Sequence, residues 1–180
     1  MSAPEAWLRG PIAGIAPLLQ PAAHAFVQIR EEMGRCLPAC SEEEAWATPG
    51  GAPSIGYHAR HLAGSTLRLL TYADGQVLDA GQLARLQGEA SVPVPRPDGA
   101  ALWREVEEAI DGAMRRLHEW SERAGELLAP RAVRRGQLPS TVLGLLFHAA
   151  EHAQRHAGQV ATTARVVRGL RVEGESAGSA

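Results

Sequence analysis

The sequence predicts an all-α protein: a four-helix bundle with a long crossover between the second and third long helices. Four long segments carry apolar residues at intervals of three and four, which is the pattern of an amphipathic helix. No stretch shows the apolar–polar alternation of a half-buried strand, and no hairpin signal or internal repeat competes with the helices. A proline-rich stretch at residues 91–97 separates the second segment from the third and is expected to form the crossover.

The first long helix is expected over about residues 12–37, with Pro17 and Pro21 giving it an irregular start. A short helix should follow Ser41, because Ser41 and Glu44, three residues later, form the capping-box pattern.

The second long helix should begin after Ser54, its expected N-cap, and end near Ala73, before the turn at Gly75. A shorter helical piece is expected over residues 79–90 of the crossover.

The third long helix is expected over residues 98–125 and the fourth over residues 140–169. The segment between them contains Pro130, Gly136 and Pro139 and is expected to be a loop. The apolar stripe of the third helix consists of Leu102, Val106, Ile110, Ala113, Leu117 and Trp120.

The length of 180 residues predicts one domain, over residues 1–172. Residues 173–180 are small and polar, and we expect them to form a disordered tail. Cys36 and Cys40 are expected to be reduced, semi-buried thiols, with a disulfide or redox pair as the alternative.

The composition excludes several classes of function. The net charge is -2, and no basic patch alternates with aromatic residues, so we expect no nucleic-acid partner. All 18 basic residues are arginine, which excludes Schiff-base chemistry by a lysine. No segment is long and apolar enough for a membrane span, and no secretory signal is recognisable, so a cytoplasmic location is expected. The bias toward Ala, Arg and Gly suggests a bacterial, GC-rich genome.

Histidines cluster in two of the expected helices. His148, His152 and His156 repeat every four residues in the fourth helix, while His58 and His61 lie in the second. Residues four apart share one face of a helix, so two imidazoles can bind one ion. Two such clusters indicate a metal ion held between packed helices.

Helical phase, at about 100° per residue, selects the residues that face the expected site. On the fourth helix, His152 and Gln159 lie almost in line, with His156 and His148 about 40° to either side. His61, His152 and His156 are the expected ligands, and His148 is an additional candidate. The residues of the second helix that fall within roughly 40° of one another are His61, Ser65, Arg68 and Tyr72.

Three neutral imidazoles with one open position form a catalytic type of site. We expect one divalent ion per chain, Zn²⁺ first, with Ni²⁺, Fe²⁺, Mn²⁺ and Co²⁺ also compatible. Such an ion would lower the pKa of a bound water or thiol. Arg68 is expected to hold an anionic group of the substrate, Tyr72 to donate a hydrogen bond, and Gln159 to orient a ligand or water.

The histidine-bearing segments resemble those of a known family. The pattern SIGYHARHLAGS at residues 54–65, followed by RLLTYA at 68–73, looks like the second helix of the DinB-like (DinB/YfiT) metalloproteins. The pattern LLFHAAEHAQRHAGQ at 145–159 is similar to that family's His-x-x-x-His followed by Gly-Gln. Residues 7–11 and 18–21 match a subgroup, so the resemblance covers nearly the whole chain outside the tail.

The resemblance implies a four-helix bundle with a long crossover and a divalent metal at His61, His152 and His156. Ala157 stands where many members have an arginine. Relatives include metal-dependent transferases that use low-molecular-weight thiols such as bacillithiol or mycothiol, thiol-dependent isomerases and metal-dependent hydrolases. Homodimers are frequent among them, so a homodimer is expected here.

The leading functional hypothesis is a metal-dependent thiol S-transferase, in which a metal-activated thiol attacks an electrophilic substrate. One alternative is a hydrolase that uses metal-bound water. A second is a non-catalytic, metal-binding structural or stress-response dimer, with His148 or His58 closing the fourth position of the ion. A third is a metal-free helical bundle that serves as a stress-induced interaction module.

Overall fold

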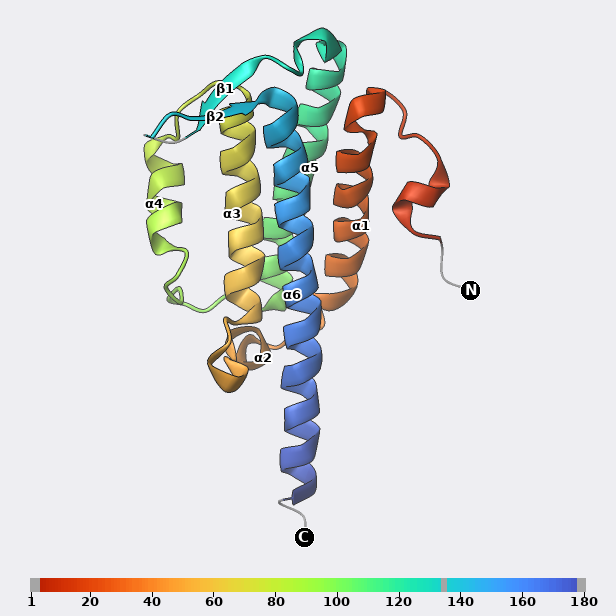
Figure 1. The fold of residues 1–180 in the computed structure, drawn as a ribbon. Coiled ribbons are helices and arrows are strands. Elements are labelled where there is room, and N and C mark those ends of the chain that lie inside the picture. The colour runs from red at the N-terminus through yellow and green to blue at the C-terminus, as the bar shows by residue number, and fades with distance from the viewer. Residues whose placement is uncertain (1–3, 134–135, 178–180) are drawn as a thin grey trace.

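The computed structural model describes residues 4–133 and 136–177, which form a bundle of long helices (Figure 1). Helices α1 and α3 each pack against both α5 and α6, so the four helices surround one apolar core. The all-α prediction is confirmed. The long helices are α1 (Gln20–Cys36), α3 (Ile55–Ala73), α5 (Gly99–Glu122) and α6 (Val142–Ala177).

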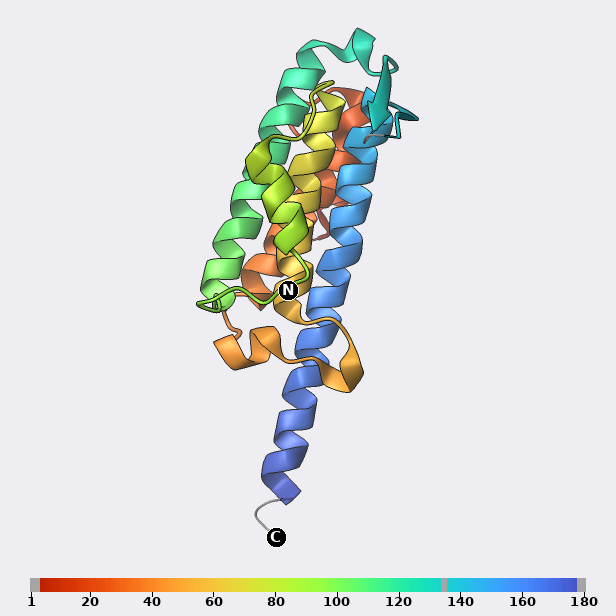
Figure 2. The same ribbon diagram turned by 90° about the vertical axis from the view of Figure 1, so that its left-hand side faces the viewer.

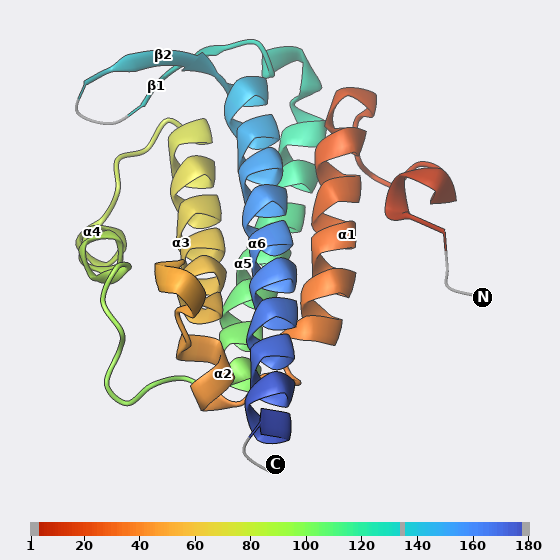
Figure 3. The ribbon, with the colours of Figure 1, turned by 60° about the horizontal axis from the view of Figure 1, so that its bottom comes forward.

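Shorter elements connect the long helices. Helix α4 lies on the connection from α3 to α5 and stands to one side of the bundle, next to α3 (Figures 2 and 3). The short elements are α2 (Glu42–Trp46), α4 (Ala80–Gly88), the strands β1 (Pro130–Val133) and β2 (Leu138–Thr141), and 3-10 turns at Ala6–Arg9, Pro17–Leu19, Pro49–Gly51 and Ala124–Glu126.

The predicted caps begin the helices as expected. Ser41 and Glu44 form the reciprocal capping box of α2, and the Ser54 hydroxyl accepts a hydrogen bond from the Tyr57 amide at the start of α3. Helix α1 begins at Gln20, after the irregular start that the prolines predicted. The Gln20 side chain binds the backbone of Ile12 and Ile15, so it holds the preceding residues in an irregular path.

The expected loop between the third and fourth long helices contains a β-hairpin, which the sequence analysis missed. β1 and β2 pair antiparallel, with Val133 opposite Leu138. Each strand has only four residues, too few to display a clear alternation of apolar and polar side chains. The chain passes from β2 directly into α6. The amide of Val142, the first residue of α6, donates to the carbonyl oxygen of Ala129, just before β1, at 3.1 Å.

Helix α6 extends beyond the rest of the bundle (Figure 1). It continues to Ala177, past the expected end near Gly169 and into the segment expected as a disordered tail; residues 178–180 lie outside the described residues. Adding turns to an existing helix avoids the cost of nucleation, and this explains the longer run. Over the described part of the chain, no helix has the length and apolar character needed to cross a membrane.

Candidate metal centre

The packing of α3 against α6 brings the two histidine clusters together. The four-residue repeat places His152 and His156 on one face of α6, while α3 contributes His61. Small residues permit this close approach, since the adjacent positions Ala153 and Ala157 of α6 are fully buried. Histidines 91 and 98 residues apart in the sequence thereby come into contact.

His61, His152 and His156 offer one nitrogen each within 4.8 Å of one another, a group that could hold a metal ion. His61 Nε2 lies 3.0 Å from His152 Nε2, and the ring centroids of His61 and His156 are 4.5 Å apart. All three side chains are partly buried. Imidazole nitrogens are common ligands of divalent transition metals, so the donor set fits such an ion.

One nitrogen of the cluster lacks a partner of its own. His152 Nδ1 is buried and has no hydrogen-bond partner among the residues that the structure describes. A buried polar atom without a partner costs free energy unless something binds it. A cation bound through Nδ1 would satisfy it, so this nitrogen is compatible with a metal at the cluster.

His152 and His156 are kept in their neutral form, which is the form that binds metals. Burial lowers the pKa of His152, and the neighbouring His61 adds to this effect. Burial, together with His61 and His152, lowers the pKa of His156 to about 4. Both rings are therefore uncharged at neutral pH, with lone pairs available to a cation.

A buried carboxylate, Glu89, lies behind His61. Glu89 Oε2 is 2.8 Å from His61 Nδ1, and Arg68 forms a two-fold ion pair with the same carboxylate. Glu89 is 6% exposed and Arg68 8%. Burial raises the pKa of Glu89, but hydrogen bonds from His61 and Arg68 outweigh burial and lower it overall. The ionised carboxylate accepts the Nδ1 proton of His61 and leaves Nε2 free for a metal.

His58 supports the cluster from the protein interior. Its Nδ1 lies 3.0 Å from Nδ1 of His156, and the side chain is 7% exposed. Burial, and secondarily His61, lowers the pKa of His58, so it is also neutral. One ring nitrogen of this pair donates to the other, which fixes the orientation of His156.

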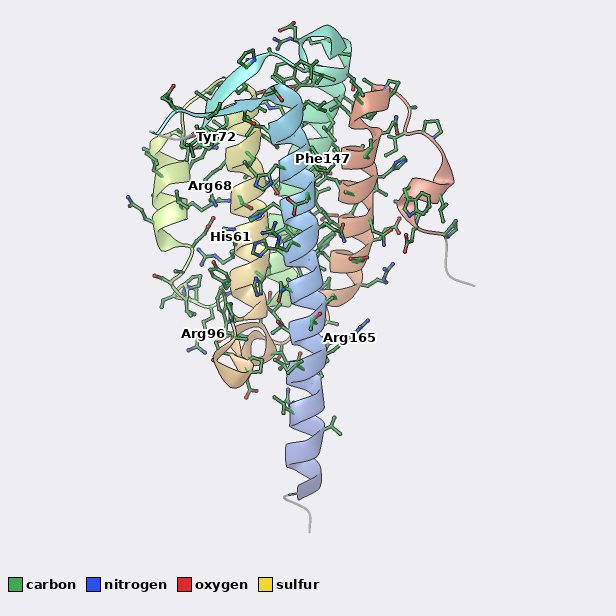
Figure 4. The ribbon with its side chains drawn as sticks, viewed as in Figure 1. His61, Arg68, Tyr72, Arg96, Phe147 and Arg165 are labelled. Carbon is green, nitrogen blue, oxygen red and sulfur yellow. The ribbon has the colours of Figure 1, made fainter. Side chains whose placement is uncertain are left out.

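A cavity of about 840 Å³ opens beside the histidines, and His61 and His152 form part of its wall. Arg68 and Tyr72 follow His61 along α3 on the same side (Figure 4). Most of the wall is apolar, with side chains from α3, α4, the hairpin and α6. These include Leu69, Leu83, Leu86, Val133, Leu138 and Leu145.

The other predicted site residues take different positions. Tyr72 lines the cavity. Arg68 also lines it, but its guanidinium is already paired with Glu89 rather than free for a substrate anion. His148 lies in the wall with half of its side chain exposed, and its Nδ1 is 3.1 Å from Glu151.

Gln159 is exposed, and the described residues that line the cavity do not include it. It is in phase with His152, but seven residues of helix displace it by about 10 Å along the axis.

Sequence reasoning missed the part played by Glu89 and His58. Glu89 follows α4, so its contact with α3 depends on the path of the crossover, which helical phase cannot reveal. The sequence gives one weak indication of the ion pair between Glu89 and Arg68, which is the glycine at position 64. A Cβ there would overlap the Glu89 carboxylate and lie 2.8 Å from Arg68 Nη1, so the glycine leaves room for the ion pair.

Comparison with known families agrees with the geometry. No curated protein matches the chain. A family model described as the DinB superfamily matches residues 19–160, which span α1, α3, α5 and the histidine-bearing part of α6. With four long helices and a three-histidine cluster over the matched region, the chain belongs to the DinB superfamily.

Proposed function

We propose that the protein is a metal-dependent enzyme of the thiol S-transferase type, with His61, His152 and His156 as ligands of one divalent ion. The observation that carries the proposal is that two members of the three-histidine cluster, His61 and His152, line a largely apolar cavity of about 840 Å³. A purely structural metal site has no need of such an adjoining space. A catalytic site needs room for a substrate next to the ion.

Three histidine ligands would leave a coordination position open, which supports catalysis over a purely structural role. The two histidines that would close the site lie elsewhere: His58 is bonded to His156, and His148 is turned to Glu151. Three protein ligands and one free position are typical of catalytic zinc sites. When bound, a divalent ion supplies Lewis acidity that lowers the pKa of a thiol or water.

The surrounding residues have distinct proposed roles. Glu89 holds His61 in the tautomer that presents Nε2 to the ion, and Arg68 keeps Glu89 ionised. Tyr72 donates a hydrogen bond from the cavity wall to the substrate. Because Glu89 neutralises Arg68, the wall suits an electrophile with an uncharged, apolar body rather than an anionic one.

Metal content is the first test. Elemental analysis of the purified protein, supplied with Zn²⁺, Ni²⁺, Fe²⁺, Mn²⁺ and Co²⁺ in turn, should find near one ion per chain. The variant His152→Ala/His156→Ala should lose it. The matched control is His24→Ala, which removes a histidine that bonds to the Gly10 carbonyl oxygen and is not part of the cluster. A wild-type protein that takes up none of these ions would overturn the proposal.

Turnover with and without an added thiol distinguishes a thiol transferase from a metal-dependent hydrolase. The metal-loaded protein is screened with apolar electrophiles, with a low-molecular-weight thiol present or omitted. Product that contains the thiol supports the transferase. Product that appears without thiol, by addition of water, would replace it with metal-dependent hydrolysis. The homodimer and the cytoplasmic location stay predictions, and light scattering tests the first.

A further inference from the structure

Cys36 and Cys40 form a pair of thiols at a junction of three helices. Cys36 is the last residue of α1, and Cys40 directly precedes Ser41, the N-cap of α2. The Cys40 thiol is buried, and its Sγ lies 3.3 Å from the Cys36 carbonyl oxygen. Cys36 is only partly buried, so small reagents can reach it from solvent.

Helix α6 adds positive charge to this junction. Arg168 Nη2 lies 3.5 Å from Cys40 Sγ and 3.3 Å from the Ala39 carbonyl oxygen. Arg165 lies on α6 near the lower end of α1 (Figure 4). Glu44 of α2, a carboxylate that acts on Cys40, is partly neutralised by Arg168 at 3.7 Å.

The environment makes the two thiols unequal. A hydrogen bond from Cys40, with smaller contributions from Arg168 and Arg165, outweighs burial and lowers the pKa of Cys36 to about 7. The same hydrogen bond and burial raise the pKa of Cys40. A partly exposed thiolate next to a buried, protonated thiol is the arrangement of a reactive cysteine and its resolving partner.

We propose that Cys36 and Cys40 are a peroxide-reactive thiol pair that closes to a disulfide within the chain. The Cys36 thiolate attacks hydrogen peroxide, the O–O bond breaks, and sulfenic acid forms on Cys36 with release of hydroxide. The Cys40 sulfur then attacks the Cys36 sulfur, the S–O bond breaks, and the Cys40 proton leaves with the hydroxyl as water. Both sulfurs are oxidised and the peroxide is reduced to water.

Hydrogen bonds hold the backbone around the pair. The Cys40 amide donates to the Leu37 carbonyl oxygen at 2.9 Å, and the Cys40 carbonyl oxygen accepts from the Gly99 amide at 3.2 Å. Neither cysteine lines the cavity beside the histidines. The proposal is therefore independent of the metal and of the proposed transferase.

The test treats the reduced, full-length protein with hydrogen peroxide and then alkylates the remaining thiols. The wild type should lose both alkylation sites, and its intact mass should correspond to the loss of two hydrogen atoms in a single chain. Cys40→Ser should accumulate sulfenic acid on Cys36, trapped by dimedone. Cys36→Ser should react about tenfold more slowly, because its remaining thiol is protonated and buried.

Arginine variants test the charge of the junction. Arg168→Gln should slow the oxidation of Cys36 several-fold, whereas Arg104→Gln, an exposed arginine on α5, should leave the rate unchanged. Retention of both alkylatable thiols in the peroxide-treated wild type would overturn the proposal. So would a disulfide found only between chains, or equal reaction rates for Cys36→Ser and Cys40→Ser.

Discussion

Glu89 binds two partners, accepting hydrogen bonds from His61 and from Arg68 within the protein interior. Glu89→Gln removes the charge that balances the buried guanidinium, so we expect the free energy of unfolding to fall by about 3 kcal/mol. The substitution also weakens the hydrogen bond that orients His61, so zinc affinity should fall about 10- to 100-fold. Urea unfolding and competition with a chelating dye measure the two effects.

A double variant separates stability from metal binding. In Glu89→Gln/Arg68→Met the unpaired charge is gone, so stability should recover toward the wild type while zinc affinity stays low. Wild-type zinc affinity in Glu89→Gln would show that Glu89 does not orient His61.

The depressed pKa of His156 predicts a dependence of stability on pH. In the metal-free protein this pKa is about 4, against an ordinary value of 6.5. The unfolded chain therefore binds the proton more tightly, so stability is fully present above about pH 6.5 and is lost as the pH falls toward 4. Urea unfolding in the presence of EDTA measures this loss. His156→Gln should show a shallower decline over that range, and an identical decline would contradict the assignment.

The three-histidine cluster could be predicted because a four-residue spacing defines a helical face. His61, His152 and His156 needed only the phase of two helices and the expectation that those helices pack together. Helical phase shows which residues share a face but not which of them line a cavity, so it placed Gln159 at a site whose described wall does not include it. Nor does it describe contacts made by loops, so Glu89 was not predicted, and Arg68 was assigned to a substrate anion instead of a carboxylate of the chain.

At the scale of elements, the start of α5 is fixed by a close contact with the end of α1. A Cβ at Gly99 would overlap the Leu37 carbonyl oxygen and lie 2.6 Å from that of Cys40. Both are backbone atoms that cannot rotate away, so Gly99→Ala should destabilise the protein by about 2–4 kcal/mol. Thermal and urea unfolding measure the change.

Gly158 in α6 provides the matched control. It is exposed, and a Cβ there meets nothing within 4 Å. Gly158→Ala should stabilise the helix by about 0.5–1 kcal/mol. Equal effects of the two substitutions would mean that the junction of α1 and α5 adapts more easily than its packing indicates.

The starts of α2 and α3 were predictable because a local cap encodes each of them, Ser41 for α2 and Ser54 for α3. The hairpin was not predictable in the same way. Its strands are stabilised by pairing with each other and by the adjoining start of α6, and four residues give no periodic signal. The end of α6 was misplaced because the sequence has no strong terminator near Gly169.

For the whole molecule, the proposed metal would tie α3 to α6, helices that are distant in sequence and packed along their lengths. An ion that binds only the folded chain adds about 4 kcal/mol of stability when its free concentration is 1,000 times the dissociation constant. For a chain of this size that corresponds to a rise in Tm of about 8–16 °C.

Removal of the ion by EDTA should lower the Tm of the zinc-loaded wild type by this amount, as measured by calorimetry. His152→Ala/His156→Ala should melt at the same temperature with and without EDTA, whereas His24→Ala should respond as the wild type does. If the wild type loses its ion to EDTA without a change in Tm, then the ion does not bind between α3 and α6 in the folded state, and the three histidines are not its ligands.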